Sequence, residues 1–124
     1  MNHLKRFIMM ENFKAQIRDR LTPIGFVKTD NTWSRQIVQT VPGSTISING
    51  QVMRQPDNQR NITLNIIELY EFDITDMDKG TVDDCLMLRF EILENENLAR
   101  EYEINLYPTE FAQFNSIINQ FFGI

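Results

Sequence analysis

The segment CLMLRFEILENENLAREYEINLY, residues 85–107, contains two runs in which apolar residues alternate with polar ones. The first run places apolar side chains at Leu86, Leu88, Phe90 and Ile92, and the second places them at Leu98, Tyr102, Ile104 and Leu106. Side chains of a strand point alternately to opposite faces, so this period of two predicts two strands with one buried and one solvated face. The polar segment ENEN, residues 94–97, predicts the turn of an antiparallel hairpin between them.

Three segments before this hairpin show the same period. Residues 26–38, FVKTDNTWSRQIV, predict two short strands around a turn at residues 29–32. Residues 45–54, TISINGQVMR, predict one strand whose apolar face carries Ile46, Ile48 and Val52 together with Gly50. Residues 62–72, ITLNIIELYEF, lose the alternation near Ile66 and Ile67, which predicts a bulge there or a strand buried on both faces.

The two ends of the chain have the helical period instead. Residues 4–21 repeat apolar side chains every three or four positions, and Pro23 and Gly25 then predict the end of that helix. At the other end, Thr109 is the predicted N-cap of a helix. The apolar face of this second helix comprises Phe111, Phe114, Ile117, Ile118, Phe121 and Phe122.

These elements predict a single α+β domain over residues 1–124, with an antiparallel sheet of about five to six strands and both terminal helices packed on one face. A chain of this length buries enough surface to form a core without disulfides or metals. The predicted core joins helix residues to apolar strand residues: Phe13, Ile17, Phe114, Ile118 and Phe121 against Ile48, Leu64, Leu88 and Ile104. Met10 is an alternative start, which would make residues 1–9 an N-terminal extension.

Cysteine content and the N-terminus predict the compartment. The lone Cys85 cannot form an internal disulfide, which favours a reducing setting. The apolar run at residues 7–10 is too short for a signal peptide or a membrane span. We therefore expect a soluble cytoplasmic protein without membrane contact, in a bacterium or a phage-infected host, with association to a virion as a further expectation.

Charge is distributed unevenly along the chain, whose formal net charge is −5. Residues 1–67 contain nine basic and four acidic residues, whereas residues 68–103 contain three basic and twelve acidic residues. An acidic total disfavours nucleic-acid and anionic-membrane binding, because both depend on a basic surface. The acidic half could form a surface patch, or Arg35, Arg54 and Arg60 could pair with its glutamates across the sheet.

The acidic segment EFDITDMDKGTVDDC, residues 71–85, could be taken for a cation site. An EF-hand loop needs oxygen ligands at positions 1, 3 and 5, Gly at 6 and Glu at 12. The segment fails this pattern both when Gly80 is placed at position 6 and when the loop starts at Asp76. We therefore predict a solvated turn, with no bound metal and no cofactor.

Catalytic motifs are not evident in the sequence. Its one histidine, His3, lies at the N-terminus, and the acidic neighbours of Cys85 disfavour a reactive thiolate. The five glycines are scattered and form no phosphate-binding loop. An enzyme without a recognisable motif therefore ranks third among the hypotheses.

The leading hypothesis is a non-catalytic interaction or structural accessory protein, encoded by a phage or mobile element, that works through a sheet face or edge and an acidic patch. Its partner would be another protein with a basic surface, or a second copy of the chain. The predicted contact residues are Glu91, Glu101, Glu103, Asp76 and Asp78. The alternative is an acidic inhibitor that blocks the basic nucleic-acid groove of an enzyme.

Overall fold

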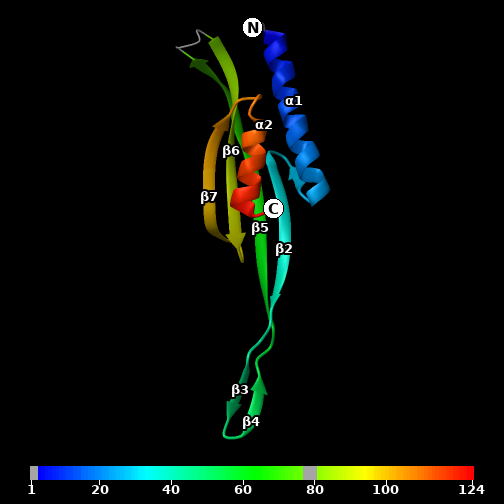
Figure 1. Ribbon diagram of the computed structural model, residues 1–124, viewed down its shortest axis with the longest axis vertical. Coiled ribbons are helices and arrows are strands. Elements are labelled where there is room, and N and C mark those ends of the chain that lie inside the picture. The colour runs from blue at the N-terminus through cyan, green and yellow to red at the C-terminus, as the bar shows by residue number, and fades with distance from the viewer. Residues whose placement is uncertain (1–2, 77–80) are drawn as a thin grey trace.

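A computed structural model describes the backbone of residues 3–76 and 81–124 and the side chains of residues 4–73 and 84–124. Along the chain, seven strands lie between an N-terminal and a C-terminal helix (Figure 1). The elements are α1 (His3–Leu21), β1 (Val27–Thr29), β2 (Thr32–Val41), β3 (Thr45–Ile48), β4 (Gln51–Arg54), β5 (Asn58–Asp76), β6 (Thr81–Glu94), β7 (Asn97–Leu106) and α2 (Phe111–Ile117). A 3₁₀ turn, Thr22–Ile24, follows α1, and a π-helical turn, Ile118–Phe122, continues α2.

Five strands form one antiparallel sheet in the order β1-β2-β5-β6-β7, and β3 and β4 form a separate two-stranded sheet. Both helices pack on one face of the larger sheet, which confirms the predicted α+β class. We call this the core face and the opposite side the open face. Buried members of the core include Phe13 and Ile17 from α1, Phe114 and Ile118 from the C-terminal helical segment, and Leu64, Leu88 and Phe90 from the sheet.

The alternation in β6 is confirmed, because Leu86, Leu88 and Phe90 are all buried. β5 and β7 each contain one register shift; the sequence predicted the one in β5 to within a few residues and did not predict the one in β7. In β5 the register shifts between Glu68 and Tyr70, just after the predicted bulge at residues 66–67. In β7 a shift pairs Leu98 with Leu93, on the open face, so the expectation that Leu98 shares a face with Tyr102 is wrong. One extra residue in a strand reverses every later side chain.

Residues 45–54 do not form the single strand that was predicted. Asn49 and Gly50 have φ angles of 51° and 78°, and they make a two-residue turn between β3 and β4. Asn-Gly favours such turns because both residues tolerate positive φ. The resulting register pairs Ile46 with Met53, and Val52 with Ser47. Met53 therefore replaces Val52 on the apolar face.

The β3–β4 hairpin extends the β2–β5 ribbon away from the body of the protein (Figure 1). We call residues 42–57 the arm. Ile48 lies in it and is 52% exposed, so its predicted place in the core is wrong. The other predicted core residues are buried or partly buried within the core cluster.

The ends of the helices are only partly as predicted. After α1, Gly25 has a φ of 94°, and its backbone N–H donates to the carbonyl of Thr22 at 3.1 Å. The predicted N-cap Thr109 is wrong: Glu110 occupies that position in α2, without a side-chain cap. The Glu110 carboxylate instead accepts from the Tyr107 backbone N–H at 2.8 Å. Over the described part of the chain, no helix is long and apolar enough to cross a membrane.

Candidate interaction site

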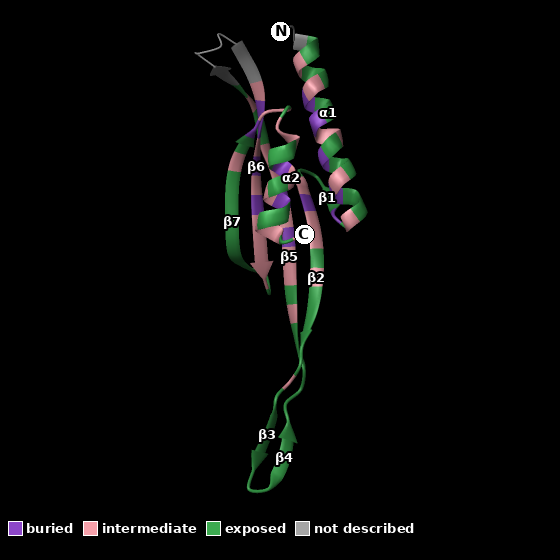
Figure 2. Ribbon diagram, viewed as in Figure 1, coloured by how far each residue is buried: buried purple, intermediate pink, exposed green. Residues whose placement is uncertain are grey.

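The arm exposes apolar side chains far from the core. Every residue of β3 and β4 is exposed (Figure 2). The apolar face carries Ile46, Ile48 and Met53, at 39%, 52% and 56% exposure, while the other face carries Thr45, Ser47, Val52 and Arg54. A two-stranded ribbon is only marginally stable in water. Contact with another surface would bury these side chains and stabilise the ribbon.

The neck of the arm is closely packed. A Cβ on Gly43 would lie 1.9 Å from the backbone oxygen of Gln55, so only glycine allows this approach of the two chain segments. The Gly43 N–H donates to the Asp57 carboxylate at 2.8 Å, and the Gln55 N–H donates to the Ser44 carbonyl at 2.9 Å. These contacts hold the two chain segments together at the base of the arm, so the arm starts at a defined point of the fold.

Three of the five predicted contact residues lie together on the open face. The registers place Glu91 of β6 directly opposite Glu101 of β7, and Arg89 opposite Glu103. Arg89 donates to the Glu103 carboxylate at 2.8 Å through Nε, which raises the pKa of Arg89 above its usual value. Glu91 accepts from the Asn65 amide at 3.4 Å. Glu101 has no cation within salt-bridge distance among the residues whose side chains are described.

The remaining two predicted contact residues are Asp76 and Asp78. The backbone of Asp76 pairs with Thr81 in the β5–β6 ladder, and its side chain lies outside the described part of the structure. Asp78 also lies outside the described residues. The candidate acidic site that the structure describes therefore comprises Glu91 of β6 with Glu101 and Glu103 of the edge strand β7.

Most other described carboxylates of the acidic half are paired with cations. Ion pairs join Arg60 to Glu94, Lys28 to Glu68 and Lys14 to Glu71. Among the described side chains, Arg60 is the one of the three arginines expected to neutralise the acidic half that pairs with a glutamate of that half. Arg54 lies 3.8 Å from Asp57 within the arm. Exposed pairs contribute about 0–1 kcal/mol each, but they remove net charge from the surface. The carboxylates of the acidic half whose side chains are described thus do not form one continuous unpaired patch.

Arg6 forms a separate cluster of charged side chains with two aspartates near the N-terminus of α1. Its guanidinium pairs with Asp73 at 2.5 Å and with Asp84. Asp73 and Asp84 lie opposite each other in the β5–β6 ladder, and a hydrogen bond to Asp84 raises the pKa of Asp73. The hydrogen bond that Arg6 itself donates to Asp84 is the main cause that raises the pKa of Arg6. Arg6 therefore connects the described part of the predicted 1–9 extension to the sheet.

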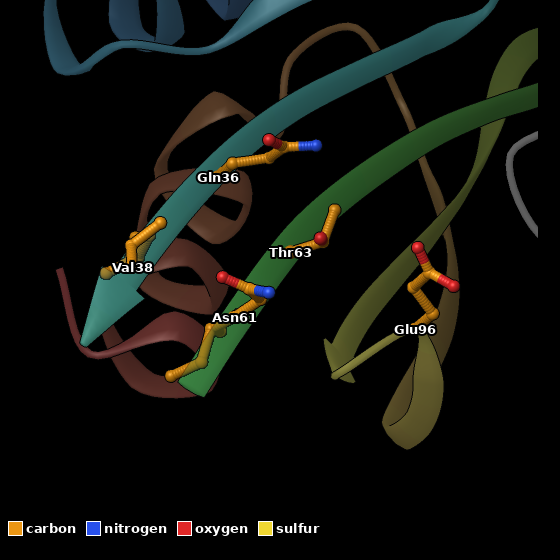
Figure 3. A pocket seen from close by; sticks show the side chains of 7 residues that line it. Gln36, Val38, Asn61, Thr63 and Glu96 are labelled. Atoms are coloured by element: carbon orange, nitrogen blue, oxygen red, sulfur yellow. The ribbon is translucent and has the colours of Figure 1, made fainter. Parts of the chain in front are cut away.

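The surface of the described residues has several hollows, and one of about 400 Å³ is lined by Arg54, Gln55, Pro56 and Asp57 of the arm. One of about 230 Å³ lies where β2 and β5 pass the β6–β7 turn, and Glu96 is its one titratable lining residue (Figure 3). Another of about 290 Å³ is lined by Phe7, Met10 and Phe72, with Glu71, Asp73 and Asp84. Ligand pockets usually measure about 300–1,000 Å³ and converge several polar groups. Among the described residues, no three His, Cys, Asp or Glu side chains are grouped to hold a metal ion.

Comparison of the chain with models of protein families, with curated proteins and with solved structures found no match. The arm is the functional candidate that sequence reasoning missed. Its signal was present as Asn49-Gly50 between two alternating segments, a strong local predictor of a hairpin.

Proposed function

We propose that this protein is a non-catalytic interaction or structural accessory component that contacts another protein through its arm. The observation that carries the proposal is the apolar face of the arm, where Ile46, Ile48 and Met53 are exposed on a ribbon that projects from the body. Exposed apolar surface with a defined shape is typical of protein contact sites. Backbone groups on the edges of the ribbon can also add to a partner sheet.

The surface charges favour this proposal over an acidic inhibitor of a nucleic-acid enzyme. Such an inhibitor needs a continuous array of unpaired carboxylates to compete with phosphate. Here Glu68, Glu71 and Glu94 each pair with a lysine or arginine of the same chain. An enzymatic function finds no support in the hollows described above.

The test is capture of partners from an extract of the encoding organism, quantified by mass spectrometry. The triple variant Ile46→Thr, Ile48→Thr, Met53→Thr removes the apolar face while keeping the β propensity of the positions. Val52→Thr is the matched control, because Val52 is 71% exposed on the opposite face. We expect the wild type and the control to retain the same proteins and the triple variant to lose them. Equal capture by the triple variant would overturn the proposal.

A further inference from the structure

We infer that the arm of one copy of this protein docks on the β7 edge of a second copy, with β4 (Gln51–Arg54) as the added strand. This inference deepens the proposed function by naming the partner. β7 is the outermost strand of the five-stranded sheet and is ten residues long, enough to accept a four-residue strand. Strand addition at such an edge pairs backbone groups that otherwise face water.

On the open face of β6 and β7, three described carboxylates, Glu91, Glu101 and Glu103, surround one cation, Arg89. Glu91 and Glu101 lie directly opposite each other across β6 and β7, and like charges in that arrangement destabilise a sheet. Arg89 donates its hydrogen bonds to Glu103, and Glu91 and Glu101 share only its longer-range attraction. A cation brought in on the next strand would therefore stabilise this pair.

The arm carries a cation, Arg54, on the face of β4 that can continue the open face of β7. On β4, Arg54 and Val52 share one face, while Met53 belongs to the apolar face with Ile46. On β7, Glu101 and Glu103 share the open face. When the apolar face of the arm continues the core face of the sheet, Arg54 must fall on the open face alongside these glutamates. The Arg54 side chain is 74% exposed, and its ion pair with Asp57 is long, at 3.8 Å, and lies at the surface, so a new partner can compete for it.

The apolar side chains match in the same arrangement. The core face of β7 carries Tyr102, which is 44% exposed because it lies on the outermost strand, and Ile104, which is partly buried. Met53 and Ile46 would extend this apolar surface outward. The reverse alignment would place Arg54 on the side of Arg100, whose guanidinium lies 5.0 Å from the Phe121 ring, and Met53 among the glutamates. The first alignment thus brings Arg54 to the glutamates and Met53 to apolar side chains, whereas the reverse alignment makes neither contact.

Other pairings of the available edges fit less well. Two β7 strands paired with each other would bring Glu101 and Glu103 of both copies together, which is unfavourable. At the other side of the sheet, β1 is a three-residue edge strand that carries Lys28, and β2 is open beyond Ser34 and carries Arg35; neither edge carries an acidic residue. The contact from arm to β7 edge is heterologous, so repetition gives a ring if the rotation closes and a filament if it does not.

The test is a charge exchange read by sedimentation velocity from low micromolar to near-millimolar concentration. The wild type should show a mass that rises with concentration. Arg54→Glu and Glu101→Arg should each weaken the association constant by about tenfold or more, because each places like charges side by side. The double variant should restore it. Asp19→Arg, the same charge change as Glu101→Arg but on an exposed part of α1, should leave it unchanged.

The outcomes separate the inference from the proposed function. A wild type that stays monomeric throughout, or a double variant no better than the single ones, would overturn docking on β7. If the wild type is monomeric but the triple arm variant still loses captured proteins, the arm binds a different protein and only this inference fails. Circular dichroism and thermal midpoints of the variants check that the fold is retained, since Arg54 and Glu101 lie outside the core.

Discussion

Two isoleucines, Ile48 and Ile118, offer a matched test of where the core ends. Ile118 is fully buried among the core residues, whereas Ile48 is 52% exposed on the arm. Truncation of a buried Ile to Ala removes its transfer free energy and leaves a cavity, at a cost of about 2–5 kcal/mol. A surface substitution stays within about 0.5 kcal/mol. The same chemical change should therefore differ severalfold between the two positions.

The assay is urea unfolding followed by fluorescence of Trp33, the single tryptophan, which is buried in the core cluster. Ile118→Ala should lower the free energy of unfolding by about 2–5 kcal/mol, which is roughly 8–20 °C in the thermal midpoint for a chain of this length. Ile48→Ala should leave both nearly unchanged. An Ile48→Ala variant that loses as much stability as Ile118→Ala would show that the arm packs on the core, and would contradict the placement of Ile48 outside it.

Three further predictions follow from the neck, the cysteine and the acidic turn. Gly43→Ala should loosen the neck and speed tryptic cleavage at Arg54 with little change in thermal midpoint, and an unchanged cleavage rate would contradict the close approach. Cys85 is 1% exposed, so its thiol should react with an aromatic disulfide reagent only as fast as the protein opens, and rapid labelling of the native protein would contradict its burial. Millimolar Ca²⁺ or Mg²⁺ should leave the thermal midpoint unchanged, whereas a rise that disappears in the double variant Asp76→Asn, Asp78→Asn would reveal a site in the acidic turn.

The body of the fold was predictable because strong periodicity survives in its sequence. Leu86, Leu88 and Phe90 alternate on a central strand that is buried by both helices, and period and burial agree there. The positions of the register shifts were not predictable with the same accuracy. A single extra residue near Leu98 costs little free energy locally but turns its neighbours to the opposite face of the sheet. The shift can be seen only from the residues with which they pair on β6.

The arm shows why alternation alone cannot define a core. Ile46 and Ile48 have the spacing of buried strand residues, but periodicity states that one face is apolar and not which surface covers it. The positive φ angles of Asn49 and Gly50 then exchange Val52 for Met53 on that face.

Charge pairing was equally hidden from the sequence. Arg6 and Asp84 are far apart in the chain, and they meet because α1 runs beside the β5–β6 ladder. The grouping of Glu91, Glu101 and Glu103 was anticipated from their alternation with apolar residues. Their opposition across β6 and β7 depends on the register, which no sequence pattern specifies.

The most direct test of the account is hydrogen exchange of backbone amides at dilute and at concentrated protein. Docking of the arm on the β7 edge predicts slower exchange in two segments at high concentration, Gln51–Arg54 and Asn97–Leu106, with the buried strand β6 unchanged. Arg54→Glu should remove the protection from both segments together. Equal exchange at the two concentrations, or protection confined to other surfaces, would contradict the arm as the contact element between copies.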